Sequence, residues 1–270
     1  MQAAPTRTRL FFQHDSKLRQ LQTVVTATVP FSALTEAQRA LFKLPGHDGH
    51  VVITEGTVFH PQGGGQPSDE GTMKALVGGG FFTVAAARKD DAGQVLHLGH
   101  FEAGGSEFDV GQAVEQTVDA DKRLLYSRLH TAGHVLGAAV RHLLEQEIEG
   151  FDELKASHFP DSAACEFQGL IEGRWKGSIQ ERVDEYVQRA MPVEIDWWDE
   201  GDFRANGLER LIPDQNQAAP GEKFRVVKIV GAEVYPCGGT HVDTTDLCGK
   251  TTVKKISRAK GVSRVSYSVA

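Results

Sequence analysis

The stretch His130-Thr-Ala-Gly-His134 lies inside the longest periodic segment of the chain. Apolar residues recur there at intervals of three or four positions and stop just before Gly150: Leu125, Leu129, Ala132, Leu136, Val140, Leu144 and Ile148. This pattern predicts an amphipathic helix, with Asp119 or Asp121 as its N-cap. The two histidines, four residues apart, project from one face of such a helix, so both imidazoles can reach a single metal ion.

A second pair of potential ligands follows about a hundred residues later, in Cys237-Gly-Gly-Thr-His241. One pair at this spacing arises often by chance on a helix surface or in a loop, whereas two pairs are much less common. Imidazole and thiolate donors suit zinc in a tetrahedral site better than they suit Mg²⁺ or Ca²⁺. The residues therefore predict a metal site made of His130, His134, Cys237 and His241.

The composition is that of an ordinary globular chain, with 270 residues, 40% hydrophobic and 24% charged. No run approaches the 18 or so apolar residues that a membrane helix needs, and no apolar core of a signal peptide follows the first nine residues. Three cysteines without a framework of spacings favour a reducing compartment. We therefore expect a cytoplasmic protein that does not contact a membrane.

The net charge of −7 excludes a surface that is basic overall. Residues 250–264, however, contain no Asp or Glu and six basic residues: Lys250, Lys254, Lys255, Arg258, Lys260 and Arg264. A local cluster of this kind is typical of a nucleic-acid interface and equally of a solvated face. On charge alone, both interpretations stand.

The fold class predicted is α+β, with a small N-terminal β-barrel at 1–118 and an α/β sandwich at 119–270. Short β-branched or aromatic runs at 23–29, 50–54, 81–85 and 94–98 predict the barrel, interrupted by one helix that ends near Phe42 and is capped by Ser32 or Thr35. After the long helix, Ser178-Ile-Gln-Glu181 predicts a capping box that opens another helix. Later strands at 164–167, 192–197, 224–230, 251–256 and 263–269 predict a mainly antiparallel sheet.

A glycine-rich loop, Phe59 to Asp69, stands among the barrel strands and contains Gly63-Gly-Gly-Gln66. Consecutive glycines allow positive φ and expose backbone N–H groups that can meet a phosphate or a ribose. A plain turn is the commoner explanation of such a run. A P-loop is excluded, because no Gly-Lys-Ser/Thr follows.

Together these motifs resemble the AlaX family of free-standing alanyl-tRNA editing proteins, which share a module with the editing domains of alanyl- and threonyl-tRNA synthetases. Lys260-Gly-Val-Ser-Arg264 is similar to the closing segment of that family. The resemblance implies a zinc-dependent deacylase that hydrolyses the ester of mischarged alanine tRNA carrying serine or glycine. Its partner would be mischarged tRNA(Ala), and its oligomeric state is left open.

The resemblance also implies roles for further residues. Thr131 and His158 are the catalytic candidates. Thr131 would hydrogen-bond a seryl hydroxyl or equally its own helix backbone, and His158 would position water or equally be a surface histidine. The loop residues Gly63, Gly64, Gly65 and Gln66 would bind substrate. The basic cluster near the end of the chain, rather than the resemblance, supplies the candidates for tRNA binding: Lys254, Lys255, Lys260 and Arg264. One residue departs from the family pattern, because Gly133 stands where Thr or Ser usually precedes the second histidine, which leaves the choice among serine, glycine and other esters open.

Two further functions remain as alternatives at this point. The first is a zinc-stabilised RNA-binding module without catalysis, since four protein ligands are typical of a closed structural zinc site. The second is a metal-dependent hydrolase of a small-molecule ester or amide. Whether the zinc performs chemistry or only orients substrate is not decided by the residues.

Overall fold

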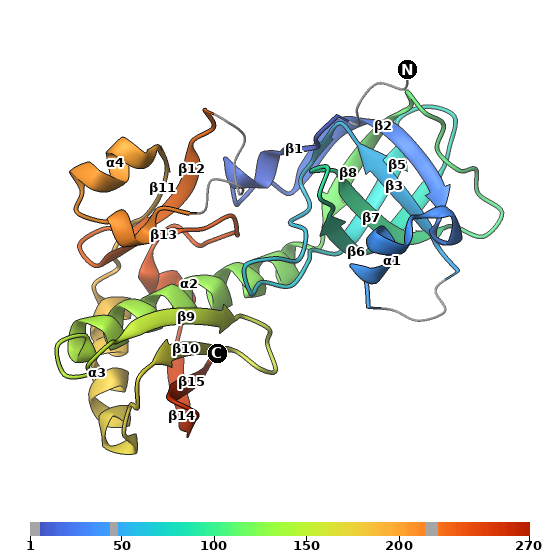
Figure 1. Cartoon of the computed structure of the whole chain (residues 1–270). Coiled ribbons are helices and arrows are strands. Elements are labelled where there is room, and N and C mark those ends of the chain that lie inside the picture. The colour runs from blue at the N-terminus through green and yellow to red at the C-terminus, as the bar shows by residue number, and fades with distance from the viewer. Residues whose placement is uncertain (1–5, 44–47, 214–220) are drawn as a thin grey trace. The chain divides into compact units, whose positions relative to one another are not determined.

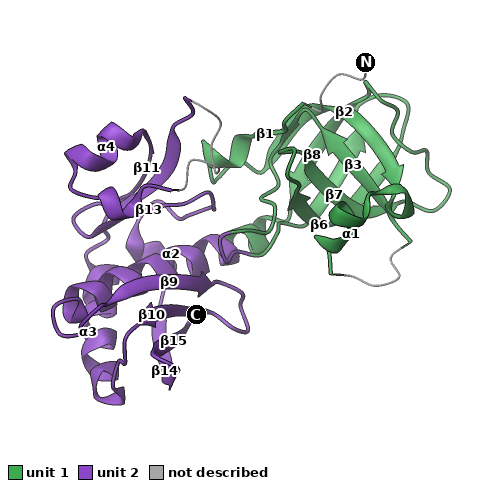
Figure 2. Cartoon of the chain, in the orientation of Figure 1, with its two compact units in different colours: residues 1–63, 67–124 green, residues 64–66, 125–270 purple. Residues whose placement is uncertain are grey.

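The computed structural model describes residues 6–43, 48–213 and 221–270. The chain forms two compact units, one made of residues 1–63 and 67–124 and the other of residues 64–66 and 125–270 (Figure 2). The tip of the glycine-rich loop thus belongs to the second unit, although it lies in the sequence of the first. The predicted domain limits, 1–118 and 119–270, stay a prediction.

Six antiparallel strands of the first unit close a barrel in the order β2-β3-β7-β6-β5-β8 (Figure 1). Their bounds are β2 Gln20–Pro30, β3 His50–Thr54, β5 Gly71–Ala75, β6 Phe81–Lys89, β7 Val95–Phe101 and β8 Ala113–Val118. Alternate residues point inward, and Phe82, Val52 and Met73 are completely buried in the core. The predicted barrel is confirmed, but β5 and β8 were missed because their threonine, lysine and glutamine residues weaken the apolar alternation.

Smaller elements complete the first unit. Strand β1 (Arg9–Leu10) pairs in parallel with β4 (Gly56–Thr57), and helix α1 spans Glu36–Ala40. Thr35 caps this helix in a capping box with Gln38, which confirms one of the two predicted caps. Two 3-10 turns, η1 Phe11–Gln13 and η2 Phe31–Ala33, precede β2 and α1, respectively.

The predicted long helix is α2, Ala120–Leu144. Asp119 is its N-cap, since its carboxylate accepts a hydrogen bond from the backbone N–H of Lys122 at 3.0 Å. The chain passes from the first unit into the second within this helix. Its apolar stripe is completely buried at Leu136 and Val140 in the main core of the second unit.

The second unit contains two antiparallel sheets (Figure 1). The larger has the order β14-β15-β10-β9, with bounds β9 Asp152–Ser157, β10 Ala164–Gln168, β14 Thr251–Ala259 and β15 Val262–Val269. The smaller has the order β11-β12-β13, with bounds β11 Val193–Trp198, β12 Phe224–Ile229 and β13 Glu233–Pro236. The α+β class with a barrel and mainly antiparallel sheets is therefore confirmed.

Helix α3 (Lys176–Gln188) begins earlier than the sequence indicated. The predicted cap at Ser178 is wrong, because the chain enters the helix directly from the 3-10 turn η3 (Gly173–Trp175), and Trp175 is the N-cap without any side-chain hydrogen bond. A short helix α4 (Glu200–Ala205), capped by Asp199, was not predicted. The remaining 3-10 turns are η4 Glu209–Leu211 and η6 Thr245–Cys248.

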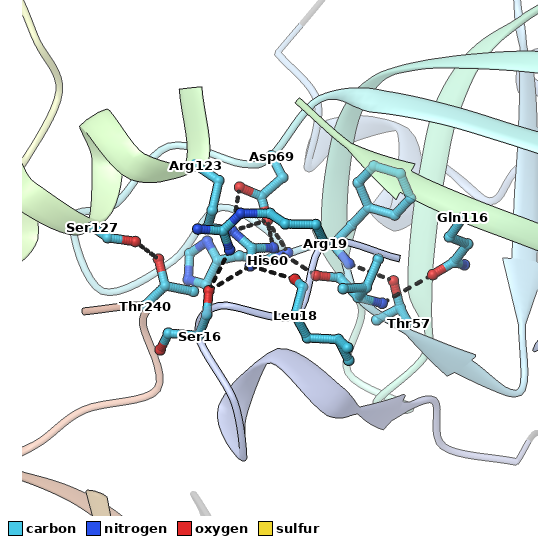
Figure 3. Close-up of polar contacts among 12 residues, drawn as sticks. Ser16, Leu18, Arg19, Thr57, His60, Asp69, Gln116, Arg123, Ser127 and Thr240 are labelled. Atoms are coloured by element: carbon cyan, nitrogen blue, oxygen red, sulfur yellow. Dashed lines mark hydrogen bonds and ion pairs between the residues drawn. The ribbon is translucent and has the colours of Figure 1, made fainter. Parts of the chain in front are cut away.

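A buried ion pair fixes both ends of the glycine-rich loop within the first unit (Figure 3). Arg123, completely buried, donates to the carboxylate of Asp69 and to the backbone oxygen of Val58. Asp69 in turn accepts from the backbone N–H of His60, and the N–H of Asp69 donates to the carbonyl of His60 at 2.9 Å. These bonds join His60 to Asp69 and so close the segment 61–68 at its base.

In the described residues, no helix is long and apolar enough to cross a membrane. The expectation about a signal peptide concerns residues 1–9, of which 1–5 lie outside the described part.

Candidate metal centre

The two ligand motifs lie together in the second unit. His130 and His134 come from the middle of α2, and Cys237 and His241 come from the loop that follows β13. One potential ligand atom from each of the four side chains lies within 4.8 Å of the other three. The Sγ atom of Cys237 is 3.4 Å from Nε2 of His130 and 3.3 Å from Nε2 of His241. The four side chains therefore have the donor types and the spacing to hold one metal ion.

The imidazole of His134 carries a further sign of a binding site. Its Nδ1 atom is buried and has no hydrogen-bond partner within the described residues. Burial lowers the pKa of His134 well below its ordinary value, and His158 and Arg225 lower it further. A neutral imidazole with a buried and unsatisfied nitrogen is uncommon unless that nitrogen faces a ligand.

Gln66, at the tip of the glycine-rich loop, orients His130. Its Oε1 atom lies 2.7 Å from Nδ1 of His130 and accepts the backbone N–H of Thr240 at 2.9 Å. Its Nε2 atom donates to the hydroxyl of Thr240, which is also hydrogen-bonded to Ser127 at 2.8 Å (Figure 3). Because an amide oxygen only accepts, His130 carries its proton on Nδ1, and Nε2 presents a lone pair toward Cys237. A role of Gln66 in direct substrate binding stays a prediction.

Thr131 supports His241 in a similar way. Its hydroxyl donates to the carbonyl of Ser127, one turn earlier, and lies 3.1 Å from Nδ1 of His241. The same oxygen accepts the backbone N–H of Val242. Because the single hydroxyl proton is donated to Ser127, the hydroxyl oxygen accepts a hydrogen bond from Nδ1 of His241. The observed contacts of Thr131 therefore orient His241, a potential ligand. Its predicted catalytic role is not tested by them.

Glycine at position 239 is required by the close approach of its loop to His130. A Cβ atom there would lie 2.2 Å from Cε1 of His130 and 2.6 Å from Oε1 of Gln66. No real Cβ makes contacts of that length, so the loop passes over the imidazole as bare backbone. Glycine at position 239 is therefore a steric necessity of this site.

His158 directly follows β9 and lies against the four potential ligands. Its ring stacks on that of His130 at a centroid distance of 4.2 Å, and its Nδ1 is 2.7 Å from the hydroxyl of Tyr267 on β15. Burial lowers the pKa of His158 to about 4, so the ring is neutral at physiological pH. The structure thus brings this predicted residue beside the potential ligands, whereas Tyr267 had no sequence signal beyond its place in a strand.

The three glycines of the loop differ in their surroundings. Gly65 has a φ of +79°, and a Cβ there would lie 2.4 Å from the carbonyl oxygen of Ala156. Its own carbonyl accepts the backbone N–H of His158 at 2.8 Å. Gly64 also has a positive φ, with nothing within 4 Å of its Cβ position, and Gly63 is exposed in the first unit. The backbone of Gly65 therefore helps to hold His158, and substrate binding by the three glycines stays a prediction.

The predicted tRNA-binding residues lie on the hairpin of β14 and β15. Lys254, Lys255 and Lys260 are exposed, and within the described residues none of them forms an ion pair. Arg264 differs, because its guanidinium pairs with Glu166 at 3.1 Å and donates to the carbonyl of Ser162. Three unpaired ammonium groups on one hairpin are available to a polyanion, and Arg264 is partly engaged already.

Two residues near the cluster were missed by the sequence interpretation. Arg225 on β12 is mostly buried and donates to the carbonyl of Cys237. Burial raises the pKa of the Cys237 thiol, and Arg225 and the N–H of Gly239 oppose this effect by favouring the thiolate. The ring of Tyr235 lies 4.4 Å from that of His134. Neither residue belongs to a recognisable motif, since both contacts depend on how the smaller sheet packs near α2.

Comparison with known proteins shows what the chain, including part of this site, is similar to. Residues 224–266 match the family model described as the threonyl and alanyl tRNA synthetase second additional domain, and this range includes Cys237 and His241. The chain is 30% identical over 232 residues to an alanine–tRNA ligase of Methanosphaera stadtmanae, which covers 83% of this chain and 24% of that protein. It is 31% identical over 222 residues to an alanine–tRNA ligase of Methanobrevibacter smithii, which covers 81% and 24%.

A third relative is an alanyl-tRNA editing protein, AlaX-L, of Pyrococcus horikoshii, 28% identical over 218 residues. That alignment covers 80% of this chain and 50% of the relative. The chain thus spans between a quarter and a half of the length of these relatives. The alignments extend over both units, so the likeness is not confined to the metal motifs. The chain is therefore similar to the AlaX family of alanyl-tRNA editing proteins and to a segment of alanine–tRNA ligases.

Proposed function

We propose that this protein hydrolyses the ester bond of alanine tRNA that carries the wrong amino acid, serine or glycine. The observation that carries the proposal is the convergence of His130, His134, Cys237 and His241, with donor atoms within 4.8 Å of one another. The partner would be mischarged tRNA(Ala), and the metal would be zinc. The similarity of the chain to an alanyl-tRNA editing protein supports the reaction class.

The donor set fits zinc. A tetrahedral zinc ion binds sulfur at about 2.3 Å and imidazole nitrogen at about 2.0 Å, which separates the two ligand atoms by roughly 3.5 Å. The separations of Cys237 Sγ from the histidine Nε2 atoms, 3.4 and 3.3 Å, agree with this. Hydrogen bonds to Nδ1 of His130 and Nδ1 of His241 leave Nε2 of both rings as the donor atom, as is usual for zinc-binding histidines.

Zinc bound by these residues would supply Lewis acidity for an ester carbonyl or a water molecule. The surrounding side chains do the positioning. Gln66 and Thr131 hold two imidazoles in fixed tautomers, and Arg225 favours the thiolate of Cys237 by its positive charge. His158 adds a neutral imidazole at the edge of the cluster. These hydrogen bonds and charges hold the potential ligands in a preorganised arrangement, which an ester hydrolase needs.

Elemental analysis tests the metal. We expect one zinc per chain in protein purified without chelators, and loss of zinc in Cys237→Ala. The matched control is Cys248→Ala, since Cys248 is completely buried and lies in the hydrophobic core. Absence of stoichiometric zinc from the unaltered protein, or full retention in Cys237→Ala, would refute the metal assignment.

Deacylation assays test the reaction. We expect rapid hydrolysis of Ser-tRNA(Ala) and Gly-tRNA(Ala), and slow hydrolysis of Ala-tRNA(Ala), with all activity lost in Cys237→Ala. Equal rates on the three esters would remove the editing assignment. If zinc and tRNA both bind but no ester is hydrolysed, the protein is instead a zinc-stabilised RNA-binding module, for which four protein ligands are typical.

Substitutions on the exposed hairpin of β14 and β15 test whether tRNA is the partner. Replacing Lys254 and Lys255 by Gln should weaken binding to tRNA and reduce its dependence on salt, because two phosphate contacts are lost. The control replaces Lys223 and Lys228 by Gln; it removes the same charge, but these lysines already pair with Asp202 and Glu194. Equal effects of the two double variants would contradict the hairpin as an interface. Failure of uncharged tRNA to compete with the ester substrate would favour a small-molecule hydrolase.

A further inference from the structure

Position 133, between the two histidines of α2, is filled by side chains from elsewhere in the second unit. A Cβ atom at Gly133 would lie 2.4 Å from Cε1 of His158, 2.5 Å from its Nδ1 and 2.7 Å from the hydroxyl of Tyr267. A glycine here does not leave a hole. It lets the imidazole and the phenol hydroxyl lie directly against the helix backbone, beside two potential ligands.

The hydrogen bonds of Tyr267 determine where His158 carries its proton. The phenol hydroxyl donates to the carbonyl oxygen of Leu129 at 2.8 Å. A phenol has a single proton, so toward Nδ1 of His158, at 2.7 Å, the same oxygen acts as the acceptor. His158 is therefore protonated on Nδ1, and its Nε2 has a free lone pair.

The Nε2 atom of His158 forms no hydrogen bond to the described residues. Within the described part of the chain, the hydrogen bonds of His158 are those of its Nδ1 and of its backbone N–H, which donates to Gly65. Its side chain is nonetheless almost completely buried, with 2% of the residue exposed, and its ring is stacked on His130. Nε2 is not one of the fully buried polar atoms, so it is an acceptor that a donor group of a ligand can reach.

We propose that Tyr267 is a positioning residue that fixes His158 as the Nδ1–H tautomer, so that Nε2 of His158 accepts a hydrogen bond from a donor group of the aminoacyl substrate. The α-ammonium group and the seryl hydroxyl are the donors of the amino-acid part of such a substrate, and the free ribose hydroxyl beside the ester is a donor of its nucleoside part. This inference rests on the proposed function for its substrate class. The tautomer itself is a property of the protein and can be measured without any turnover.

The first measurement is the nitrogen spectrum of the histidine rings in the zinc-loaded full chain, labelled with 15N. We expect His158, identified by the loss of its signals in His158→Gln, to show the Nδ1–H tautomer, and this preference to be lost in Tyr267→Phe. The control is Tyr186→Phe, because the hydroxyl of Tyr186 lies 2.6 Å from Nδ1 of His142, another Tyr–His pair outside the cluster. An Nε2–H tautomer of His158, or an unchanged spectrum in Tyr267→Phe, would overturn the proposal.

The second measurement is deacylation of seryl and glycyl esters of tRNA(Ala) by the same variants. Tyr267→Phe should lower kcat by about tenfold to a hundredfold with a small change in KM, since misplaced groups reduce turnover more than binding. Tyr186→Phe should match the unaltered protein, and retained zinc and thermal unfolding temperature should show that Tyr267→Phe is folded. His158→Gln keeps an acceptor near the position of Nε2 and should retain more activity than His158→Asn.

The two esters identify the donor. A loss in His158→Asn on both esters assigns the contact to a donor that they share, the α-ammonium group or the free ribose hydroxyl. A loss on the seryl ester alone assigns it to the seryl hydroxyl. Unchanged rates on both esters would overturn the proposal. An unaltered protein that hydrolyses neither ester would instead refute the proposed function, and the spectrum of His158 would still report the tautomer.

Discussion

The Oε1 atom of Gln66 lies 2.7 Å from Nδ1 of His130, although the two residues are 64 positions apart in the sequence. The contact joins the tip of the glycine-rich loop to the helix that carries two potential metal ligands. The loop is closed at its base by Asp69 and Arg123 within the first unit, and its tip is part of the second. The glycine-rich motif therefore orients one of the four potential metal ligands through the side chain of Gln66, in addition to any contact that it makes with substrate.

Replacing Gln66 should weaken metal binding. Gln66→Ala removes the acceptor of the Nδ1 proton of His130, and loss of such a supporting contact typically costs about 10-fold to 100-fold in metal affinity. Competition with a coloured zinc chelator measures this. Gln62→Ala is the control, since Gln62 belongs to the same loop and is exposed. Equal zinc affinity of the two variants would contradict the role assigned to Gln66.

Alanine at position 133 should destabilise the protein even though alanine favours helices. A Cβ there meets the ring of His158 at 2.4 Å, and overpacking of this kind costs about 1 to 3 kcal/mol. Gly177→Ala in α3 is the control, because its Cβ position has nothing within 4 Å, and alanine should stabilise that helix by up to about 1 kcal/mol. Urea unfolding measures both. The loss at position 133 should shrink in a His158→Ala background; a loss of the same size there would place the clash elsewhere.

Breaking the buried pair of Arg123 and Asp69 should destabilise the barrel unit strongly. Arg123→Met leaves a carboxylate that is 1% exposed without its counter-charge, which costs about 3 to 5 kcal/mol. The control is Arg174→Met, because Arg174 pairs with Glu172 at the surface, where such pairs contribute about 1 kcal/mol or less. Chemical unfolding measures the two variants. A similar small loss in both would show that Asp69 does not depend on Arg123.

The buried histidine of the barrel should make stability depend on pH. Burial lowers the pKa of His97 to about 4, below the 6.5 of the unfolded chain, and its ring is hydrogen-bonded to Thr57 and Val52. As the pH falls, His97 therefore takes up a proton at a higher pH in the unfolded state than in the folded state. The stabilising contribution is complete above pH 6.5 and is lost between 6.5 and about 4, with a loss of roughly 2 kcal/mol at pH 5.

The free energy of unfolding at pH 7.5 and at pH 5 tests this in the unaltered protein and in His97→Gln. The variant should lose about 2 kcal/mol less between the two pH values, because glutamine does not titrate there. Other histidines titrate in both proteins and cancel in the comparison. Parallel changes in the two proteins would show that His97 is protonated in the folded state.

Much of the fold was predictable because it depends on local periodicity. The stripe from Leu125 to Leu144 repeats every three or four residues, and a helix is the structure that buries such a stripe. Strands of the barrel with clean alternation were found, whereas β5 and β8 were not, since neighbouring strands bury them more than their own composition indicates. The capping box predicted at Ser178 was wrong, because the 3-10 turn η3 runs directly into α3 and the helix has already begun before Ser178.

The candidate metal ligands were also predictable, because each pair depends only on the spacing within a short motif. The spacing in each motif places two donors within reach of one ion whatever the rest of the chain does, on a helix for His130 and His134 and in a glycine loop for Cys237 and His241. The sequence by itself therefore determined the helix, the two ligand pairs and the barrel class.

Only the tertiary structure decided what surrounds those ligands. Gln66 reaches His130, His158 and Tyr267 fill the space at Gly133, and Tyr267 directs the proton of His158. Each of these contacts joins segments that are far apart in the chain, and one hydrogen bond or one missing methyl group leaves no periodic trace in a sequence. Side chains that touch a ligand follow from local spacing, whereas those that orient it depend on the packing of loop, helix and sheet.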